Sequence, residues 1–191
     1  LNGYESHLKT YGGGIESQTV EFKTSIVYPP DNDSYPDMAR QMRTILTVIA
    51  AFLNTDGGTL YIGANDSGGG LGVYDDLCYK EFHGDKDKYQ RAVLDGVALT
   101  WGNSVASFVS AAWDTDNTSG KDVLVVTVNA YAPGVDIDGK WVYRNGSGNR
   151  HLTKVEFEQY NARRQEQRAM ELQATTPTTE APTTPIAKPE E

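Results

Sequence analysis

Cysteine and histidine are scarce in this chain of 191 residues, and their scarcity excludes several kinds of site. The single cysteine, Cys78, cannot form an internal disulfide framework or a multi-cysteine zinc site. The three histidines, His7, His83 and His151, stand far apart in the sequence, and none has a partner at metal-ligand spacing. A chain without a disulfide framework is typical of the cytoplasm, and we expect a cytoplasmic protein.

Long apolar runs are missing as well. No stretch of about 18 apolar residues occurs, so we expect no membrane-spanning segment. No charged-then-apolar signal peptide opens the sequence. Hydrophobic residues make up 38% of the chain, a low share that a polar C-terminal tail dilutes. The remainder, through about Tyr160, is long enough to bury a core.

Positive charge is scarce, because 17 Lys and Arg face 26 Asp and Glu and the net charge is −9. Such a chain is poorly suited to coat duplex DNA nonspecifically, since phosphate binding depends on clustered cations. The charge is unevenly distributed: residues 140–168 hold seven cations and three acids, whereas residues 1–139 carry a net charge of −10. We therefore expect a local basic strip on a repulsive background, which suits a selective or metal-assisted encounter.

Hydrophobic periodicity predicts an α+β domain. Residues 19–26 alternate with period two, so Val20 and Phe22 share one strand face while Glu21 and Lys23 share the other. Apolar residues at helical spacing in residues 38–53 predict an amphipathic helix that faces the core. The other predicted strands are 59–64, 71–74, 105–113, 123–128 and 141–144, and the other predicted helices are 89–101 and 154–170. This order predicts a mixed β-sheet of about five to six strands with three main helices.

Composition divides the chain into three parts. Residues 1–13 form a flexible N-terminal lead that runs into Gly12-Gly13-Gly14. Residues 14–170 form the domain. Residues 171–191 are rich in Thr and Pro and lack an apolar period, which predicts a disordered tail or linker.

The segment Asn54-Thr-Asp-Gly-Gly-Thr-Leu-Tyr-Ile-Gly-Ala-Asn-Asp66 is the most informative stretch of the sequence. It is typical of a helix end, a glycine turn, a buried strand and a carboxylate just past the strand. Glycines permit a close backbone reversal with φ above zero. We expect the polar groups of Asn54, Asp56 and Asp66 to gather around one end of the sheet.

Three carboxylates form the first candidate site. Glu21 lies on the polar face of the first strand, Glu16 just before that strand, and Asp66 just after another. If the two strands are neighbours, the acids could converge on a divalent cation, Mg²⁺ or Mn²⁺, that activates water and holds a phosphodiester. Lys23 would then stabilise the developing phosphate charge. The alternative is that all three are ordinary solvent-facing acids, with Asp66 a turn residue.

Basic residues near the C-terminus form the second candidate site. Arg144 ends a predicted strand, Arg150 closes the loop Asn-Gly-Ser-Gly-Asn, and Lys154 opens the last helix. A strand end, a donor-rich loop and a helix N-terminus together favour phosphate contacts, and we assign nucleic-acid binding to these three residues. The alternative is a hairpin or capping loop with a solvated arginine.

Three segments together resemble the Schlafen AlbA_2 domain, a family long labelled a DNA-binding or divergent AAA domain. They are Glu16–Lys23 (ESQTVEFK), Ala51–Asp66 (AFLNTDGGTLYIGAND) and Tyr143–Arg150 (YRNGSGNR). The resemblance extends over roughly residues 14–162 and implies association with RNA or DNA. In vertebrate Schlafen proteins the domain is implicated in cleaving transfer and ribosomal RNA through three metal-binding carboxylates. Their motifs match Glu16, Glu21 and Asp66, so the resemblance implies a metal-dependent ribonuclease with Mg²⁺ or Mn²⁺.

Two departures from the vertebrate proteins leave a second function open. The vertebrate core has two such lobes that form a cradle, whereas this chain has one, so an RNA groove would require a homodimer. Many single-lobe microbial members carry a separate C-terminal domain and are regarded as regulators. The alternative function is therefore a non-catalytic regulatory or protein-interaction module, attached through its C-terminal linker to another domain, and the acidic surface favours it.

Overall fold

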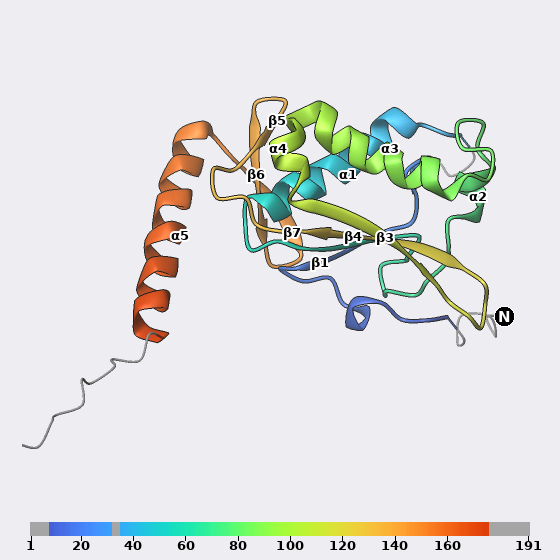
Figure 1. Cartoon of the computed structure of the whole chain (residues 1–191), viewed down its shortest axis with the longest axis horizontal. Helices are drawn as coiled ribbons and strands as arrows, with labels where there is room; N and C mark the ends of the chain where they lie inside the picture. Colours follow the sequence, from blue (N-terminus) through green and yellow to red (C-terminus); the bar gives the residue numbers. More distant parts are fainter. Residues whose placement is uncertain (1–7, 32–34, 176–191) are drawn as a thin grey trace, which may run out of the picture.

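Two sheets and a layer of helices make up the fold (Figure 1). The computed structural model describes residues 8–31 and 35–175. A four-stranded mixed sheet has the order β1-β2-β4-β3, and a three-stranded sheet has the order β5-β6-β7. The strands are β1 (Val20–Lys23), β2 (Gly58–Ile62), β3 (Val109–Thr115), β4 (Asp122–Val128), β5 (Asp136–Ile137), β6 (Lys140–Asn145) and β7 (Gly148–Leu152). The helices are α1 (Met38–Leu53), α2 (Tyr74–Cys78), α3 (Lys86–Trp101), α4 (Asn103–Ala106) and α5 (Lys154–Thr175).

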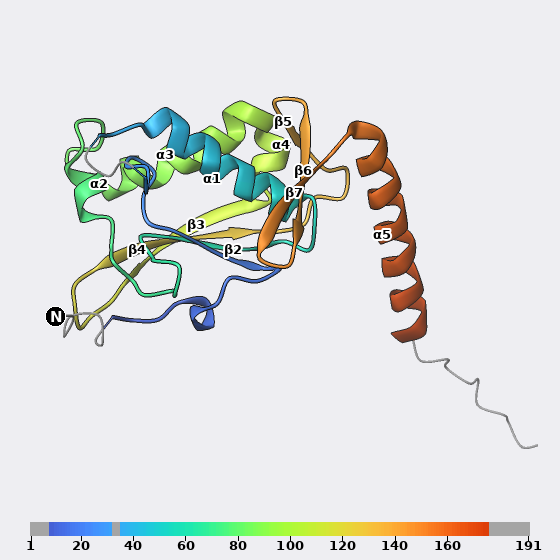
Figure 2. The ribbon, with the colours of Figure 1, turned by 180° about the vertical axis from the view of Figure 1, so that it is seen from behind.

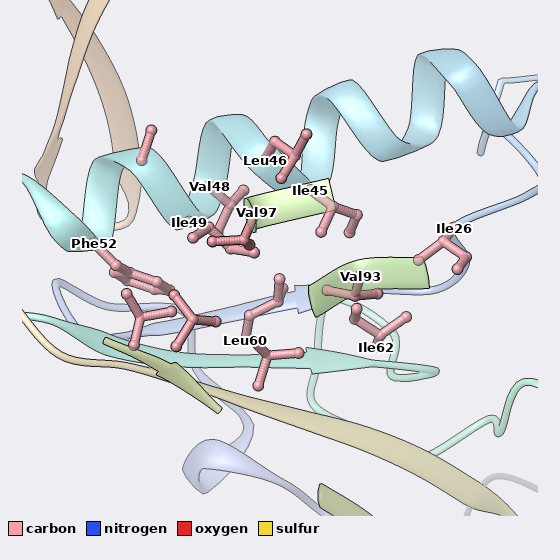
Figure 3. Close-up of a cluster of buried hydrophobic side chains, with 14 of the residues drawn as sticks. Ile26, Ile45, Leu46, Val48, Ile49, Phe52, Leu60, Ile62, Val93 and Val97 are labelled. Atoms are coloured by element: carbon pink, nitrogen blue, oxygen red, sulfur yellow. The ribbon is translucent and has the colours of Figure 1, made fainter. Parts of the chain in front are cut away.

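Helices α1 and α3 cover one face of the four-stranded sheet (Figure 1). Helix α1 begins after Asp37, whose carboxylate accepts a hydrogen bond from the backbone N–H of Arg40 and so caps the first turn. Its buried side meets Leu60 and Ile62 of β2 and Val93 and Val97 of α3 (Figure 3). This amphipathic helix and the central strands β2 and β4 therefore build the core, as the apolar period predicts.

The opposite sheet face has a smaller apolar cluster of its own. Tyr11 lies buried beside Phe22, and the ring of Tyr61 packs 5.3 Å from that of Tyr11. The short 3-10 helix η2 (Gly12–Gly14) follows, and a Cβ added at Gly12 would lie only 2.5 Å from the Val20 side chain. Tyr11 and Gly12 thus pack on the sheet rather than forming part of a flexible lead, while residues 1–7 lie outside the described chain.

The predicted α+β class and the three main helices are confirmed, but the described strands number seven and divide between two sheets. Residues 71–74 are not a strand: Leu71 and Gly72 both donate to the carbonyl of Gly63, and α2 starts directly afterwards. Residues 145–149, predicted as a loop, instead turn hairpin β6–β7. Gly146, with φ of 63°, takes the first central turn position, where only glycine fits without strain.

Helix α5 leaves the body of the domain beside the three-stranded sheet (Figures 1 and 2). It extends to Thr175, five residues past the predicted end, and the Thr/Pro-rich residues 176–191 lie outside the described chain. None of the helices in the described ranges has the length and apolar content needed to cross a membrane.

Candidate functional site

Strand β1 buries the carboxylate of Glu21. Strands β1 and β2 run parallel with Glu21 opposite Leu60, so strand alternation directs Glu21 away from Phe22, toward the face that α1 covers. The side chain is 5% exposed. Its two oxygens form ion pairs with Lys23 and Arg144, which arrive from β1 itself and from β6. The negative charge is therefore compensated twice within the fold.

Arg144 is the partner that fixes this arrangement. Its guanidinium donates to the carbonyl of Ser17 at 3.0 and 2.9 Å, to the carbonyl of Val20 at 2.9 Å, and to Oδ1 of Asn149 at 3.1 Å. With the bond to Glu21, all five N–H donors are occupied. The side chain is 2% exposed. In this conformation no donor remains for a phosphate, so Arg144 anchors hairpin β6–β7 to the edge of β1.

Glu16 completes an acidic pair with Glu21. A carboxylate oxygen of Glu16 accepts a long hydrogen bond, 3.4 Å, from the backbone N–H of Phe22. Burial raises the pKa of Glu16, and the charge and hydrogen bonding of the Glu21 carboxyl group raise that pKa further, while Lys23 and the Phe22 amide lower it. The structure thus brings two of the three predicted acids together, with Lys23 beside them.

Asp66 follows β2 in a tight polar turn. The Oδ1 atom of Asn65 accepts from the backbone N–H groups of Ser67 and Gly69 at 3.1 and 2.7 Å and holds the turn closed. Asp66 itself is exposed. Within residues 8–31 and 35–175, no group of three or more His, Cys, Asp or Glu side chains is placed to hold a metal ion. The described acids therefore do not form a ready site for Mg²⁺ or Mn²⁺, and that assignment stays a prediction.

The expectation that Asn54, Asp56 and Asp66 share one end of the sheet is wrong. Asn54 and Asp56 precede β2 and Asp66 follows it, so the strand separates them by about 3.3 Å per residue. Buried Asn54 donates to the carbonyls of Val135 and Val142 at 2.8 and 2.7 Å. It also accepts from the Val135 N–H at 2.7 Å, so it links the end of α1 to the three-stranded sheet.

The turn after Asn54 requires glycine. Gly57 has φ of 79°, and a Cβ there would lie 2.5 Å from the carbonyl oxygen of Val128. A Cβ at Gly58 would lie 2.5 Å from the Phe52 ring and 2.8 Å from the carbonyl oxygen of Thr19. These glycines let the end of α1, the start of β2 and the segment before β1 approach one another.

The other two predicted phosphate contacts, Arg150 and Lys154, are exposed. Arg150 pairs with Tyr143 across hairpin β6–β7, and the Tyr143 ring lies 5.0 Å from that of Tyr160 in α5. Lys154 lies in the first turn of α5, where Thr153 and Glu156 form a capping box. Arg150 thus borders a small aromatic surface where the hairpin meets α5, while Lys154 lies at the start of that helix, 3.9 Å from a carboxylate oxygen of Glu158.

Comparison with known proteins now identifies the family. A family model, described as Schlafen, AlbA_2, matches residues 16–153. The chain belongs to the Schlafen AlbA_2 family. No curated protein sequence matches it. Among solved structures, the DIP2311 protein from Corynebacterium diphtheriae is similar with a TM-score of 0.52 and 22% identity, a likeness of fold. The match covers 75% of this chain and 26% of that protein, so this chain spans about a quarter of its length.

The signature segments of this AlbA_2 domain meet at one junction. Asn54 from the glycine motif, Glu21 from the first motif and Arg144 from the last all join the three-stranded sheet to α1 and β1. Two positions that the motif reading missed also belong there. Gln18 donates to the carbonyl of Arg144 at 3.1 Å, and Arg164 of α5 donates to the carbonyl of Asn54 at 2.5 Å. Their side chains are ordinary surface types, so no local pattern marks them.

Proposed function

We propose that this AlbA_2 domain associates with nucleic acid through the surface that hairpin β6–β7 and the first turns of α5 form. The observation that carries the proposal is exposed Arg150, paired across the hairpin with Tyr143, whose ring packs against that of Tyr160. Exposed Lys154 at the start of α5 adds a second cation. Cations bind backbone phosphates, and aromatic faces stack on unpaired bases. A single strand of RNA or DNA satisfies both requirements.

Internal bonding reduces the charge of the basic strip. Arg144 pairs with Glu21, and Arg168 donates to Asp56 at 3.0 Å. Burial lowers the pKa of Arg164, which donates to backbone carbonyls at the end of α1. Fewer cations remain for phosphate than the sequence count suggests, on a chain whose net charge is −9. We therefore expect binding that is weak, selective and strongly salt-dependent.

Fluorescence anisotropy with labelled single-stranded RNA and DNA tests this surface. The R150A/K154A variant should bind less tightly than wild type, and its slope of log K against log salt should be shallower by about two, one per lost phosphate contact. The matched control is K80A/K88A, which removes the same charge from exposed positions elsewhere. Equal binding by the two variants would refute the proposed surface. No binding at ~50 mM salt, where phosphate contacts are strongest, would instead favour the protein-interaction module.

A metal-dependent ribonuclease is the second candidate, and the Glu16–Glu21 pair favours it. Two adjacent carboxyl groups repel each other when both ionise, and a divalent cation would relieve that repulsion. Asp66 would supply a third oxygen ligand, and Lys23 would meet the phosphate. Since the described acids do not form a three-ligand group, this candidate requires the loop of Asp66 to close on the pair.

Cleavage of structured RNA in the presence of Mn²⁺ tests the second candidate. We expect E16Q/D66N to lose cleavage while it keeps wild-type folding, because neither side chain anchors Arg144. A Glu21 variant is unsuitable, since its loss would disturb the fold itself. The control D95N changes an exposed acid of α3. Equal cleavage by E16Q/D66N and wild type would reject the ribonuclease. Sedimentation velocity with and without RNA tests whether two copies assemble.

A further inference from the structure

A cavity of about 720 Å³ opens beside the C-terminal end of β1. Two segments far apart in sequence form its walls: residues 24–30, which follow β1, and residues 71–78, which include α2. Its volume lies in the range of clefts that hold small organic ligands. Neither Glu16, Glu21 nor Arg144 lines it, so it is separate from the junction described above.

A buried carboxylate without a counter-charge lines this cavity. Asp76 is 2% exposed. Its Oδ1 accepts from the Ser25 hydroxyl at 2.5 Å, and its Oδ2 accepts from the Ile26 N–H at 2.9 Å and the Tyr89 hydroxyl at 2.7 Å. All three donors are neutral, and no lysine or arginine in the described ranges forms an ion pair with it. A carboxylate offers about four acceptor positions, so one on Oδ1 stays open.

The remaining lining suits a cation with an apolar stem. Tyr28 and Tyr74 line the cavity, and Tyr74 is 77% exposed. Aromatic faces and carboxylates both attract cations. Asp75 adds a second negative charge at the cavity, and burial together with the charges of Asp76 and Asp75 raises the pKa of Tyr28. Pro29, Leu71 and other apolar side chains provide the surface that an aliphatic stem would cover.

We propose that this cavity binds an organic cation, an ammonium group on an aliphatic stem, with the ammonium at Asp76 and the stem against Tyr74 and the apolar wall. A free polyamine and the side chain of a lysine share this chemistry. A bare metal ion fits less well, because it would meet one buried carboxylate and two rings instead of a set of oxygens. The site is independent of the nucleic-acid surface on β6–β7 and α5.

Titration of the full chain with n-butylammonium, followed by ¹H–¹⁵N amide shifts, tests the proposal. Saturable shifts at Ser25, Val73 and Asp76 are expected with n-butylammonium and none with n-butanol, its uncharged analogue. Equal responses to the two probes would overturn the proposal. Spermidine and Nα-acetyl-lysine methylamide then distinguish the two sources, because the tighter binder identifies the natural ligand class. Weaker binding of Nε-acetylated lysine would confirm that the charge is recognised.

Two variants keep the test decisive if one fails to fold. D76N should weaken n-butylammonium binding at least about ten-fold, as loss of a charge-assisted hydrogen bond implies. Y74A changes an exposed side chain and should weaken it about three-fold, the usual effect of a cation–π contact at an accessible site. D95N, on α3, should bind like wild type. The site is refuted if Y74A and a folded D76N each bind n-butylammonium with wild-type affinity. If D76N does not fold, wild-type affinity in both Y74A and D75N refutes it.

Discussion

Replacing Arg144 with methionine tests whether the anchor between β1 and hairpin β6–β7 holds this fold together. Methionine fills a similar volume but donates no hydrogen bond. The change leaves the carbonyl of Ser17 without its Arg144 donors and leaves the carbonyl of Val20 with the Ser17 N–H alone. It also removes one of the two cations that neutralise Glu21. The packing of the guanidinium over the Phe52 ring, 5.3 Å from its centroid, is lost as well.

The expected loss is large because the pair is buried. Removing one partner of a buried ion pair costs about 3–5 kcal/mol, most of it from the uncompensated charge that remains. Lys23 still pairs with Glu21, so we expect the lower part of that range. Stabilities of single domains lie near 5–15 kcal/mol, so R144M should lose a substantial share of its unfolding free energy. The exposed control R150M should change it by less than about 0.5 kcal/mol.

Urea unfolding followed by tryptophan fluorescence provides the measurement. Trp141 in β6 stacks on Phe157 and so reports on the three-stranded sheet that Arg144 anchors. The double variant E21Q/R144M completes a mutant cycle, and we expect a coupling free energy of about 1–3 kcal/mol between the two positions. An R144M unfolding free energy within about 1 kcal/mol of wild type, or a coupling near zero, would refute the anchor.

Three further predictions concern Glu16, Gly58 and Arg164. Burial and the neighbouring Glu21 raise the pKa of Glu16, so the stability that its protonated form provides is lost as pH rises through that pKa. E16Q should therefore have a higher Tm than wild type at neutral pH and an equal Tm in acid. Equal Tm values at every pH would contradict this. G58A inserts a Cβ 2.5 Å from a ring and should cost about 1–3 kcal/mol in urea unfolding, whereas G148A, with 3.8 Å of clearance, should not. R164A removes donors to the end of α1 and should speed amide exchange in α5 alone; unchanged exchange would show that α5 is held otherwise.

Local periodicity predicts the elements that build the core. Helix α1, helix α3 and the hairpin of β3 and β4 follow from apolar spacing and a polar turn, because each buries one face against its neighbours. The sequence also carries a signal for hairpin β6–β7, because Gly146-Ser147 between short strand segments is typical of a two-residue hairpin turn. A loop over residues 145–149 leaves no room for β7, which begins at Gly148 and contains Arg150.

The environment of Glu21 could not be predicted from local pattern. Alternation correctly separates Glu21 from Phe22, yet a polar strand face is expected to meet water. Here Arg144, more than a hundred residues further on, covers that face. A carboxylate becomes buried when a guanidinium arrives with it, and only the tertiary fold brings the two together. Because Glu21 is far from Arg144 in the sequence, the local pattern around Arg144 favours a solvent-facing phosphate ligand.

Asp66 differs from Glu21, because the sequence predicts a site residue and the structure places it in an exposed turn. Its place after a buried strand suggested a site, and the family resemblance assigned it to a metal. The structure closes its turn through Asn65, whose side chain satisfies the backbone that Asp66 would have to rearrange. Bringing Asp66 to Glu16 requires a conformational change of this turn, which sequence spacing does not indicate.

A match to the AlbA_2 signature therefore reports mainly on architecture in this chain. Arg144 and Asn54 use their hydrogen-bonding groups within the junction, and the motif glycines lie where neighbouring segments leave no room for a Cβ. Glu16 differs, because its carboxyl group accepts a long backbone hydrogen bond from Phe22 and lies beside another acid, Glu21. E16Q therefore separates function from folding, whereas variants at Glu21, Asn54 and Arg144 report the stability of the junction.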